Sequence, residues 1–343
     1  MIFWQKVNRL LNLDTFEEVK FFQNEELCLK AVLVIHNSGK AGISIGGCRV
    51  RKYSDENVAL LEAKKLARNM TLKYNAVGMD FGGLKLVIYE IDNSRRKESF
   101  EQIGEWIESY KGKCYLATDS GSSLEDMIDV RERTSFVLDL PPYLGGIGSF
   151  TPMVVSGVIN GLKAGIELKY NKQNFHGLTA YVLGLGITGI EIAHLLLQAE
   201  CDVYGFDINN EKNRKAENLG VKIRENFLER EYNLFVPCGL DYVLNQSNSM
   251  KLQTDIIGGS ANNPLQQSEE EALYQRGIIV IPDFIISAGA ILLDDVLIAG
   301  EKTTLDEGMK RTKKIYELTK RVITQSKMSG VSPYEVALSI IRD

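Results

Sequence analysis

The fold of this chain is constrained most by residues 179–207, which read as a strand, a glycine turn, a helix and a second strand. A short apolar run leads into Gly184, Gly186 and Gly189, which are spaced as G-x-G-x-x-G. In a dinucleotide-binding turn the first glycine allows the tight turn and the second lets the backbone approach a pyrophosphate. The third lets the helix pack close to the strand, and the helix N-terminus faces the phosphates. The pattern therefore predicts a dinucleotide site, with a plain structural turn as the alternative.

An acidic residue at the end of the second strand supports a cofactor site. Asp207 stands where a carboxylate accepts hydrogen bonds from the ribose hydroxyls. NAD is the expected cofactor, because Asp207 would repel the 2′-phosphate of NADP. NADP is the alternative, since Lys212 and Arg214 follow within a few residues and could face a 2′-phosphate. Ile187 and Thr188 lie inside the glycine motif and complete the cofactor-binding residues expected there.

Length and composition limit the remaining choices. A chain of 343 residues suggests two domains, and a formal charge of −5 gives no reason to expect a nucleic-acid partner. Residues 141–162 are uncharged, but five glycines and three prolines interrupt them, so no membrane span is expected. Five scattered cysteines without C-x-x-C indicate reduced thiols in a cytoplasmic protein rather than disulfides or a metal site. The charged N-terminal segment does not read as a signal peptide.

Before the glycine motif we expect a short helix and a loop over residues 1–26, strands over 27–36 and 42–50, and a helix over 54–74. The second of these strands contains the pair Gly46-Gly47. Glycines inside a strand are costly unless the backbone needs them. Either a β-bulge or main-chain contact with a ligand would explain the pair.

Two ionisable residues stand at the ends of predicted strands or turns. Lys85 follows Gly82-Gly83, and Asp119 follows a strand and precedes a Gly/Ser loop. The alternatives are a solvated loop lysine and, for Asp119, a cap for a helix over 123–130. The three histidines have no recognisable Ser or Cys partner, so acid–base chemistry falls to lysine and carboxylates.

After the glycine motif, strands and helices alternate, which predicts a doubly wound parallel sheet. Polar or glycine-rich segments would emerge at its carboxyl edge beside the cofactor. The expected strands cover 221–223, 234–237, 255–258 and 277–281, the segments after them include 238–239, 260–263 and 287–289, and residues 304–342 are expected to be helical.

Taken together, these features resemble the Glu/Leu/Phe/Val dehydrogenase family, and most closely its leucine, phenylalanine and tryptophan type. The resemblance covers nearly the whole chain. It rests on Gly46-Gly47, Met70-Thr71-Leu72-Lys73, Gly82-Gly83-Leu84-Lys85, Thr118-Asp119, Pro152, the motif of residues 184–189, Pro237-Cys238, Ala261-Asn262-Asn263, and Pro282-Asp283 before Ser287-Ala288-Gly289.

The resemblance implies an α/β protein with two domains separated by a cleft. Residues 1–147 would form an α/β substrate and oligomerisation domain, and the C-terminal helix over 322–343 is a candidate to pack back on it. Residues 148–321 would form a Rossmann-type, doubly wound dinucleotide-binding domain. The family also implies a homo-oligomer, a dimer or larger.

The implied activity is the reversible, NAD-dependent oxidative deamination of an L-amino acid to a 2-oxo acid and ammonia. By resemblance, Lys73 binds the substrate carboxylate with help from the backbone of Gly46 and Gly47. Lys85 is the catalytic lysine, and Asp119 moves a proton to and from the amino nitrogen. Asn262 would contact the nicotinamide side or the substrate, and Cys238 and Ala261 would join it at the cofactor.

The sequence also narrows the substrate and departs from the family. Glutamate-using relatives carry a lysine where this chain has Ile45, so we expect an apolar or aromatic substrate, with Ile45 and Ala117 among the pocket walls. Leu84 replaces a glycine, and Ser287 replaces an asparagine at a position expected to bind substrate. A different reaction on an amino or oxo acid, or NAD binding without turnover, are the alternatives that these departures favour.

Overall fold

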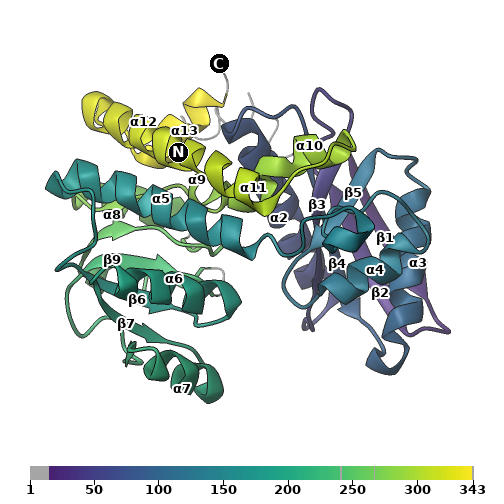
Figure 1. The fold of residues 1–343 in the computed structure, drawn as a ribbon, viewed down its shortest axis with the longest axis horizontal. Helices are drawn as coiled ribbons and strands as arrows, with labels where there is room; N and C mark the ends of the chain where they lie inside the picture. Colours follow the sequence, from purple (N-terminus) through teal and green to yellow (C-terminus); the bar gives the residue numbers. More distant parts are fainter. Residues whose placement is uncertain (1–14, 240–241, 266, 342–343) are drawn as a thin grey trace. The chain divides into compact units, whose positions relative to one another are not determined.

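The computed structural model describes residues 15–239, 242–265 and 267–341 and divides the chain into two compact units (Figure 1). Unit 1 runs to Phe150 and also takes Leu293–Thr304, which return to it late in the chain. Unit 2 takes Thr151–Leu292 and Leu305–Ile341. Each unit has its own sheet and its own hydrophobic core, so the expected two-domain α/β fold is confirmed.

Unit 1 contains a mixed five-stranded sheet in the order β1-β2-β4-β3-β5. Strands β1, β2 and β4 pair antiparallel, whereas β3 pairs parallel with both β4 and β5. The strands are β1 (Glu18–Asn24), β2 (Leu29–Ile35), β3 (Ser44–Val50), β4 (Gly82–Glu90) and β5 (Cys114–Thr118).

The expectation of a helix and loop up to residue 26 is wrong for residues 18–24, which form β1; its part over 1–14 lies outside the described residues. β1 is an edge strand, and Phe22 is its one buried residue. The exposed neighbours include charged side chains, which suit an edge but hide the alternation that marks a strand.

Helices cover both faces of the unit 1 sheet. Helices α3 (Arg96–Glu108) and α4 (Leu124–Arg131) share a core with Leu84, Leu86 and Ile88 of β4. Helix α2 (Glu56–Ala76) covers the opposite face, where alanines at helical spacing meet Val87 and residues of β2. Because side chains alternate along a strand, Lys85 of β4 lies on the face covered by α2.

Unit 2 contains a six-stranded, fully parallel sheet in the order β11-β10-β9-β6-β7-β8. The chain starts in the middle at β6, winds outward through β7 and β8, and returns to β9 on the other side. This is the Rossmann strand order, and it reverses between β6 and β9. The strands are β6 (Thr179–Leu183), β7 (Asp202–Phe206), β8 (Lys222–Ile223), β9 (Tyr232–Pro237), β10 (Thr254–Ile257) and β11 (Ile279–Val280).

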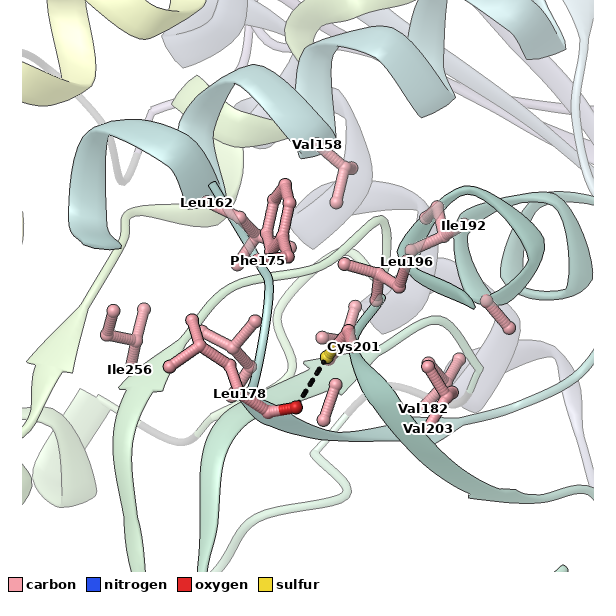
Figure 2. Close-up of a cluster of buried hydrophobic side chains, with 14 of the residues drawn as sticks. Val158, Leu162, Phe175, Leu178, Val182, Ile192, Leu196, Cys201, Val203 and Ile256 are labelled. Atoms are coloured by element: carbon pink, nitrogen blue, oxygen red, sulfur yellow. Dashed lines mark hydrogen bonds between the residues drawn. The ribbon is translucent and has the colours of Figure 1, made fainter. Parts of the chain in front are cut away.

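One hydrophobic core of unit 2 lies between its sheet and two helices, α5 (Thr151–Tyr170) and α6 (Ile187–Gln198). Figure 2 shows Val158 and Leu162 of α5 and Ile192 and Leu196 of α6 pointing toward the same cluster as Val182 of β6. All these side chains are essentially inaccessible to solvent, so the glycine turn between β6 and α6 is supported by a packed core.

The region expected to be helical over 304–342 is divided into α11, α12 and α13. Gly330, at φ 69°, ends α12, and Pro333 begins α13. Helix α12 packs on α5, and α13 packs on α12. No helix among the described residues has the length and apolar character needed to cross a membrane. The remaining helices are α7 (Asn210–Asn218), α8 (Gln267–Gln275), α9 (Asp283–Ile286), α10 (Asp294–Ile298), α11 (Leu305–Arg311), α12 (Lys313–Ser329) and α13 (Pro333–Ile340), with 3₁₀ turns at Asn93–Arg95, Pro142–Leu144, Ser249–Lys251 and Ala288–Leu293.

Candidate active site

Three neighbouring strands of unit 1 bring the two predicted catalytic residues together. Lys85 comes from β4, and Asp119 follows β5 directly. The Lys85 Nζ atom lies 2.7 Å from Asp119 Oδ2, and the Lys85 side chain is only 5% exposed. A buried ammonium with a single close carboxylate is an unusual environment for lysine, which is almost always solvated. The solvated-loop alternative for Lys85 is therefore wrong.

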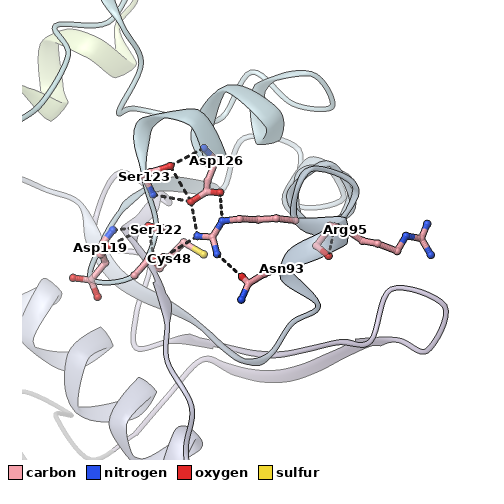
Figure 3. Close-up of polar contacts among 10 residues, drawn as sticks. Cys48, Asn93, Arg95, Asp119, Ser122, Ser123 and Asp126 are labelled. Atoms are coloured by element: carbon pink, nitrogen blue, oxygen red, sulfur yellow. Dashed lines mark hydrogen bonds and ion pairs between the residues drawn. The ribbon is translucent and has the colours of Figure 1, made fainter.

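The turn after β5 holds Asp119 in place through its backbone. The Asp119 N–H donates to Ser122 Oγ over 2.9 Å, and the Ser122 hydroxyl donates to the Cys48 carbonyl of β3 over 2.7 Å. The cap of α4 is Ser123, which forms a reciprocal capping box with Asp126. Asp119 is therefore not the helix cap, and Figure 3 shows its carboxylate pointing away from this network.

The Gly46-Gly47 pair is not a bulge, because the registers of β3 with β4 and β5 continue through it without a shift. A Cβ on Gly46 would lie 1.9 Å from the Leu84 carbonyl oxygen. A Cβ on Gly47 would lie 2.8 Å from Asp119 Cβ and 3.2 Å from Lys85 Nζ. Glycine is thus required by the neighbouring strands and by the ion pair itself. Contact between this backbone and a ligand stays a prediction.

Helix α2 packs closely against the start of β4, and this packing fixes the position of Lys73, the lysine predicted to bind the substrate carboxylate. A Cβ on Gly83 would lie 2.2 Å from the Ala67 carbonyl oxygen, so helix and strand approach too closely for any other residue. The Gly83 N–H donates to Thr71 Oγ1 over 2.9 Å. Two residues later on α2, Lys73 is buried at 8% exposure. Lys73 and Lys85 therefore belong to one rigidly packed helix–strand pair.

The apolar positions predicted to line the pocket differ in burial. Ile45, beside the glycine pair, is 1% exposed, whereas Ala117 of β5 is partly exposed. Leu84 is fully buried in the core that faces α3 and α4. It therefore lies on the opposite face of β4 from Lys85, so this departure from the family pattern contributes to the core rather than crowding the ion pair.

The charges around the pair include a cation that the sequence did not single out. Arg49 of β3 donates from Nε to the same Asp119 Oδ2 atom over 2.7 Å. The pKa of Lys85 lies below its ordinary value because burial lowers it; Asp119 opposes that shift and Arg49 adds to it. Burial alone would raise the pKa of Asp119, but Lys85 and Arg49 hold it well below its usual range. Arg49 follows Gly47 by two residues, so strand alternation was the signal that could have found it.

A second carboxylate lies behind Asp119. Asp139 is buried and accepts hydrogen bonds from the N–H of Thr118, over 2.7 Å, and from its hydroxyl. Burial raises the pKa of Asp139 to about 6; the Thr118 hydrogen bonds oppose this shift and the charge of Asp119 adds to it. Asp139 thus fixes the residue before Asp119 and titrates in a range where few carboxylates do.

In unit 2 the three glycines of the motif make a turn at the point where the strand order reverses. Gly184 has φ 95°, and a Cβ there would lie 2.7 Å from the Gly239 nitrogen after β9. A Cβ on Gly189 would lie 1.9 Å from the Gly184 carbonyl oxygen. At Gly186, by contrast, the nearest atom would be Lys212 Nζ at 4.0 Å. The first and third glycines are required by the fold, whereas the second leaves space beside the backbone.

The acid at the end of β7 is held by the glycine turn. Asp207 Oδ2 accepts from the Leu185 N–H and Oδ1 accepts from the Asn209 N–H, each over 2.9 Å. Lys212 Nζ lies 3.5 Å from Oδ2. Helix α6 starts at Ile187, which is 77% exposed, and no side chain caps it. Its first N–H groups therefore remain available to a phosphate.

The remaining predicted residues follow β9, β10 and the short helix α9. Cys238 follows β9, and burial raises the pKa of its thiol although hydrogen bonds with Ser260 oppose this. After β10, Ala261 is buried and Asn262 is partly exposed. The Ser287 hydroxyl donates to the Asp283 carbonyl over 2.6 Å, so its proton is taken up by a backbone hydrogen bond of α9. Thr188, in the first turn of α6, is partly exposed.

The residues of unit 2 fit a dinucleotide. The sheet reverses its order at the glycine turn, the space beside Gly186 is open, and the uncapped helix start and Asp207 stand beside it. Among the described residues no group of three or more His, Cys, Asp and Glu side chains is arranged to hold a metal ion.

Comparisons with known proteins match both units. A family model described as "Glu/Leu/Phe/Val dehydrogenase, dimerisation domain" matches residues 17–136, and one described as "Glutamate/Leucine/Phenylalanine/Valine dehydrogenase" matches residues 185–296. A leucine dehydrogenase of Bacillus cereus is 30% identical over 328 residues, which cover 94% of this chain and 88% of that protein. A phenylalanine dehydrogenase of Lysinibacillus sphaericus is 28% identical over 350 residues, which cover 97% and 91%. The crystal structure of an L-tryptophan dehydrogenase from Nostoc punctiforme matches with a TM-score of 0.75 and 25% identity, covering 99% of this chain and 97% of that one.

Proposed function

The chain belongs to the glutamate/leucine/phenylalanine/valine dehydrogenase family, as the sequence predicted, and from this premise we propose that it oxidatively deaminates an L-amino acid with NAD. The reaction is reversible and gives a 2-oxo acid and ammonia. The observation that carries the proposal is the buried ion pair of Lys85 and Asp119, 2.7 Å apart. It joins a base with a lowered pKa to a carboxylate, the two acid–base groups that the reaction needs.

The residues of unit 1 divide the work on the substrate. Lys73 binds the substrate carboxylate as a buried cation, and the backbone of Gly46 and Gly47 lines the same region. Asp119 accepts a proton from the amino nitrogen. Lys85, once neutral, takes a proton from the water that attacks the α-carbon after that carbon has been oxidised. Burial lowers the pKa of Lys85, so the neutral form that acts as a base is easier to reach than for a solvated lysine.

NAD, when bound, supplies the acceptor for the hydride of the α-carbon. The residues of unit 2 bind and orient it. The main chain at Gly184, Gly186 and Gly189, with the start of α6 at Ile187 and Thr188, receives the pyrophosphate, and Asp207 receives the ribose hydroxyls. Cys238, Ala261 and Asn262 follow β9 and β10 and are assigned to the nicotinamide half, and the family pattern assigns Asn262 and Ser287 to the substrate. NAD is preferred over NADP because Asp207 carries a negative charge at this edge.

The proposed substrate has an apolar or aromatic side chain. Ile45 is buried beside Gly46 and offers no charge to a second carboxylate, and Ala117 leaves room on the neighbouring strand. The named activities of the relatives, on leucine, phenylalanine and tryptophan, support the same class.

The proposal extends to the assembly and its location. The match of residues 17–136 to a model described as a dimerisation domain supports a homo-oligomer, a dimer or larger, formed through unit 1. All five cysteines are free thiols, which supports a reducing compartment, the cytoplasm.

The experiment that tests the proposal follows the near-ultraviolet absorbance of reduced nicotinamide while the protein is offered NAD and single L-amino acids. Leucine, phenylalanine and tryptophan should give a signal, and glutamate and the D-isomers should not. The same panel with NADP tests the cofactor preference. Tight NAD binding without reduction by any amino acid would contradict the proposed reaction and favour NAD binding without turnover.

A further inference from the structure

Arg49 contacts two carboxylates, those of Asp119 and Glu62, and the proposed reaction assigns it no role. Its side chain is 9% exposed, on the face of the sheet covered by α2. Nε donates to Asp119 Oδ2 over 2.7 Å, and Nη1 forms an ion pair with Glu62 of α2. A guanidinium cannot lose its proton in a protein, so this position carries a permanent positive charge. Burying it requires the two carboxylates that the structure supplies.

A single oxygen of Asp119 receives both cations. Lys85 Nζ and Arg49 Nε each lie 2.7 Å from Oδ2. With Lys85 alone, the charge of Asp119 would depend on the charge of its partner, because a neutral lysine would leave a buried carboxylate unpaired. With Arg49 on the same oxygen, Asp119 remains ionised when Lys85 gives up its proton. Two acid–base groups in contact can then hold separate roles.

We propose that Arg49, anchored by Glu62, is a positioning residue that keeps Asp119 oriented, and ionised until it accepts the proton of the substrate, whatever the charge of Lys85. The inference rests on the proposed deamination for its role, but the geometry belongs to unit 1 alone. Both cations contact Oδ2, so the second carboxylate oxygen is left to the amino nitrogen of the substrate. The fork of Arg49 spans β3, the turn after β5, and α2, and so fixes the direction of Asp119 from two sides.

Other charged and titratable groups surround the bridge that Arg49 makes between Asp119 and Glu62. Arg51 Nη1 lies 3.6 Å from Glu62 Oε2, and the hydroxyl of Tyr53 is buried near Glu62. Cys48 of β3 lies in the core on the opposite face of the sheet, and burial raises the pKa of its thiol. Asp139 faces Asp119 through Thr118. None of these carries a positive charge onto Asp119, so Arg49 is the group to vary.

The test combines two substitutions with a matched control. Arg49→Gln removes the charge, Arg49→Lys keeps the charge but loses the fork, and Arg51→Gln removes a neighbouring arginine that also approaches Glu62 but is half exposed. The titration of Lys85 is followed by NMR of protein labelled at lysine ¹³Cε, with Lys85→Ala to assign the signal. This readout needs no turnover, so it remains decisive even when the proposed reaction fails.

Arg49→Gln should raise the Lys85 pKa by roughly one unit, because a repelling cation has gone while Asp119 still attracts. In the pH dependence of kcat/KM, the apparent pKa that reports the titration of Lys85 should rise by the same amount. Arg49→Lys keeps the positive charge, so the Lys85 titration should stay nearly the same. It loses the fork that orients Asp119, so kcat should fall without a proportional rise in KM. Arg51→Gln should change neither.

An unchanged Lys85 titration in Arg49→Gln, or full kcat in Arg49→Lys, would overturn the proposal. Arg49→Gln leaves two buried carboxylates with one cation fewer and is the variant at risk of misfolding. The double variant Arg49→Gln/Glu62→Gln removes the buried ion pair as a unit, and Arg51, which also loses its contact with Glu62, is half exposed to solvent. It should give a smaller upward shift of the Lys85 pKa; no shift in the folded double variant contradicts the role of Arg49.

Discussion

The proposed sites of the two units are built from different chemical groups. In unit 1 charged side chains from separate strands meet in a buried network, and Gly47 leaves the space in which Lys85 and Asp119 approach each other. In unit 2 the proposed binding surface is the main chain, and one acid, Asp207, accepts hydrogen bonds from two backbone N–H groups. Backbone groups of a turn keep one charge state at every pH, whereas a buried ion network changes with each proton. Chemistry that moves protons belongs in the first kind of site and cofactor binding in the second.

The largest effect should come from removing the base of the charged network. Lys85→Ala should lower amino-acid oxidation by roughly 10²- to 10⁴-fold while leaving NAD binding intact, because general acid–base catalysis contributes about that much. The matched control is Lys40→Ala, a lysine that also lies near an aspartate, 3.9 Å from Asp80, but is 90% exposed. Turnover near that of the control would show that Lys85 is not the base.

The next effect concerns stability and pH. The folded-state pKa of Asp139 is raised from 3.8 to about 6, so the folded protein binds this proton more tightly than the unfolded chain does. Stability from this group is therefore present below about pH 4 and is lost as the pH rises to about 6. Asp139→Asn cannot ionise and should gain up to about 3 kcal/mol over the natural protein near pH 8. Urea unfolding at both ends of this range measures it, and an equal pH dependence in the two proteins would refute it.

The glycine of the charged network should be sensitive in a different way from the glycines of the turn. A Cβ on Gly47 would meet Asp119 Cβ at 2.8 Å and Lys85 Nζ at 3.2 Å, so Gly47→Ala must displace the pair. Turnover should fall by roughly 10²-fold, the loss expected from misplacing catalytic groups by about 1 Å. NAD affinity, measured by calorimetry, should not change. Weakened NAD binding together with normal turnover at saturating cofactor would contradict the assignment of Gly47 to the catalytic pair rather than to the cofactor site.

The smallest effect is the converse substitution in unit 2. Gly186→Ala meets no atom closer than 4.0 Å, so the fold should accept it. Its methyl group would occupy the approach of the pyrophosphate and should weaken NAD binding by roughly tenfold, about 1.4 kcal/mol. The pKa of Lys85 should be unaffected. Unaltered NAD affinity in a normally folded Gly186→Ala protein would mean that the cofactor does not approach this backbone.

The site of unit 2 could be predicted from the sequence more completely than the site of unit 1. The glycine turn of unit 2 is local, and its strand, helix and terminal acid lie within residues 179–207. The parallel sheet around it was also predicted from the alternation of strands and helices. The edge strand β1 was missed, because pairing with β2 rather than its own pattern makes it a strand.

The charged network of unit 1 depends on contacts that no local pattern contains. Lys85 and Asp119 could be named from their places at strand ends and from the family resemblance, but their approach follows from the registers of β3 with β4 and β5. Arg49 and Glu62 were missed because their partners are distant in the sequence. The place of Leu84 in the core could not be predicted for a similar reason, since the packing of α3 and α4 decides which face of β4 is the core. The domain boundary near residue 147 stays a prediction.

The measurement that tests the central claim most directly follows the hydrogen of the α-carbon. L-Leucine, L-phenylalanine and L-tryptophan, each carrying deuterium at that carbon, are incubated with the protein and NAD, and the reduced cofactor is examined by mass spectrometry. The account predicts one deuterium in the reduced cofactor from at least one of the three, with ammonia released in equal amount. Reduced cofactor without deuterium, or no reduction although NAD binds, would contradict it.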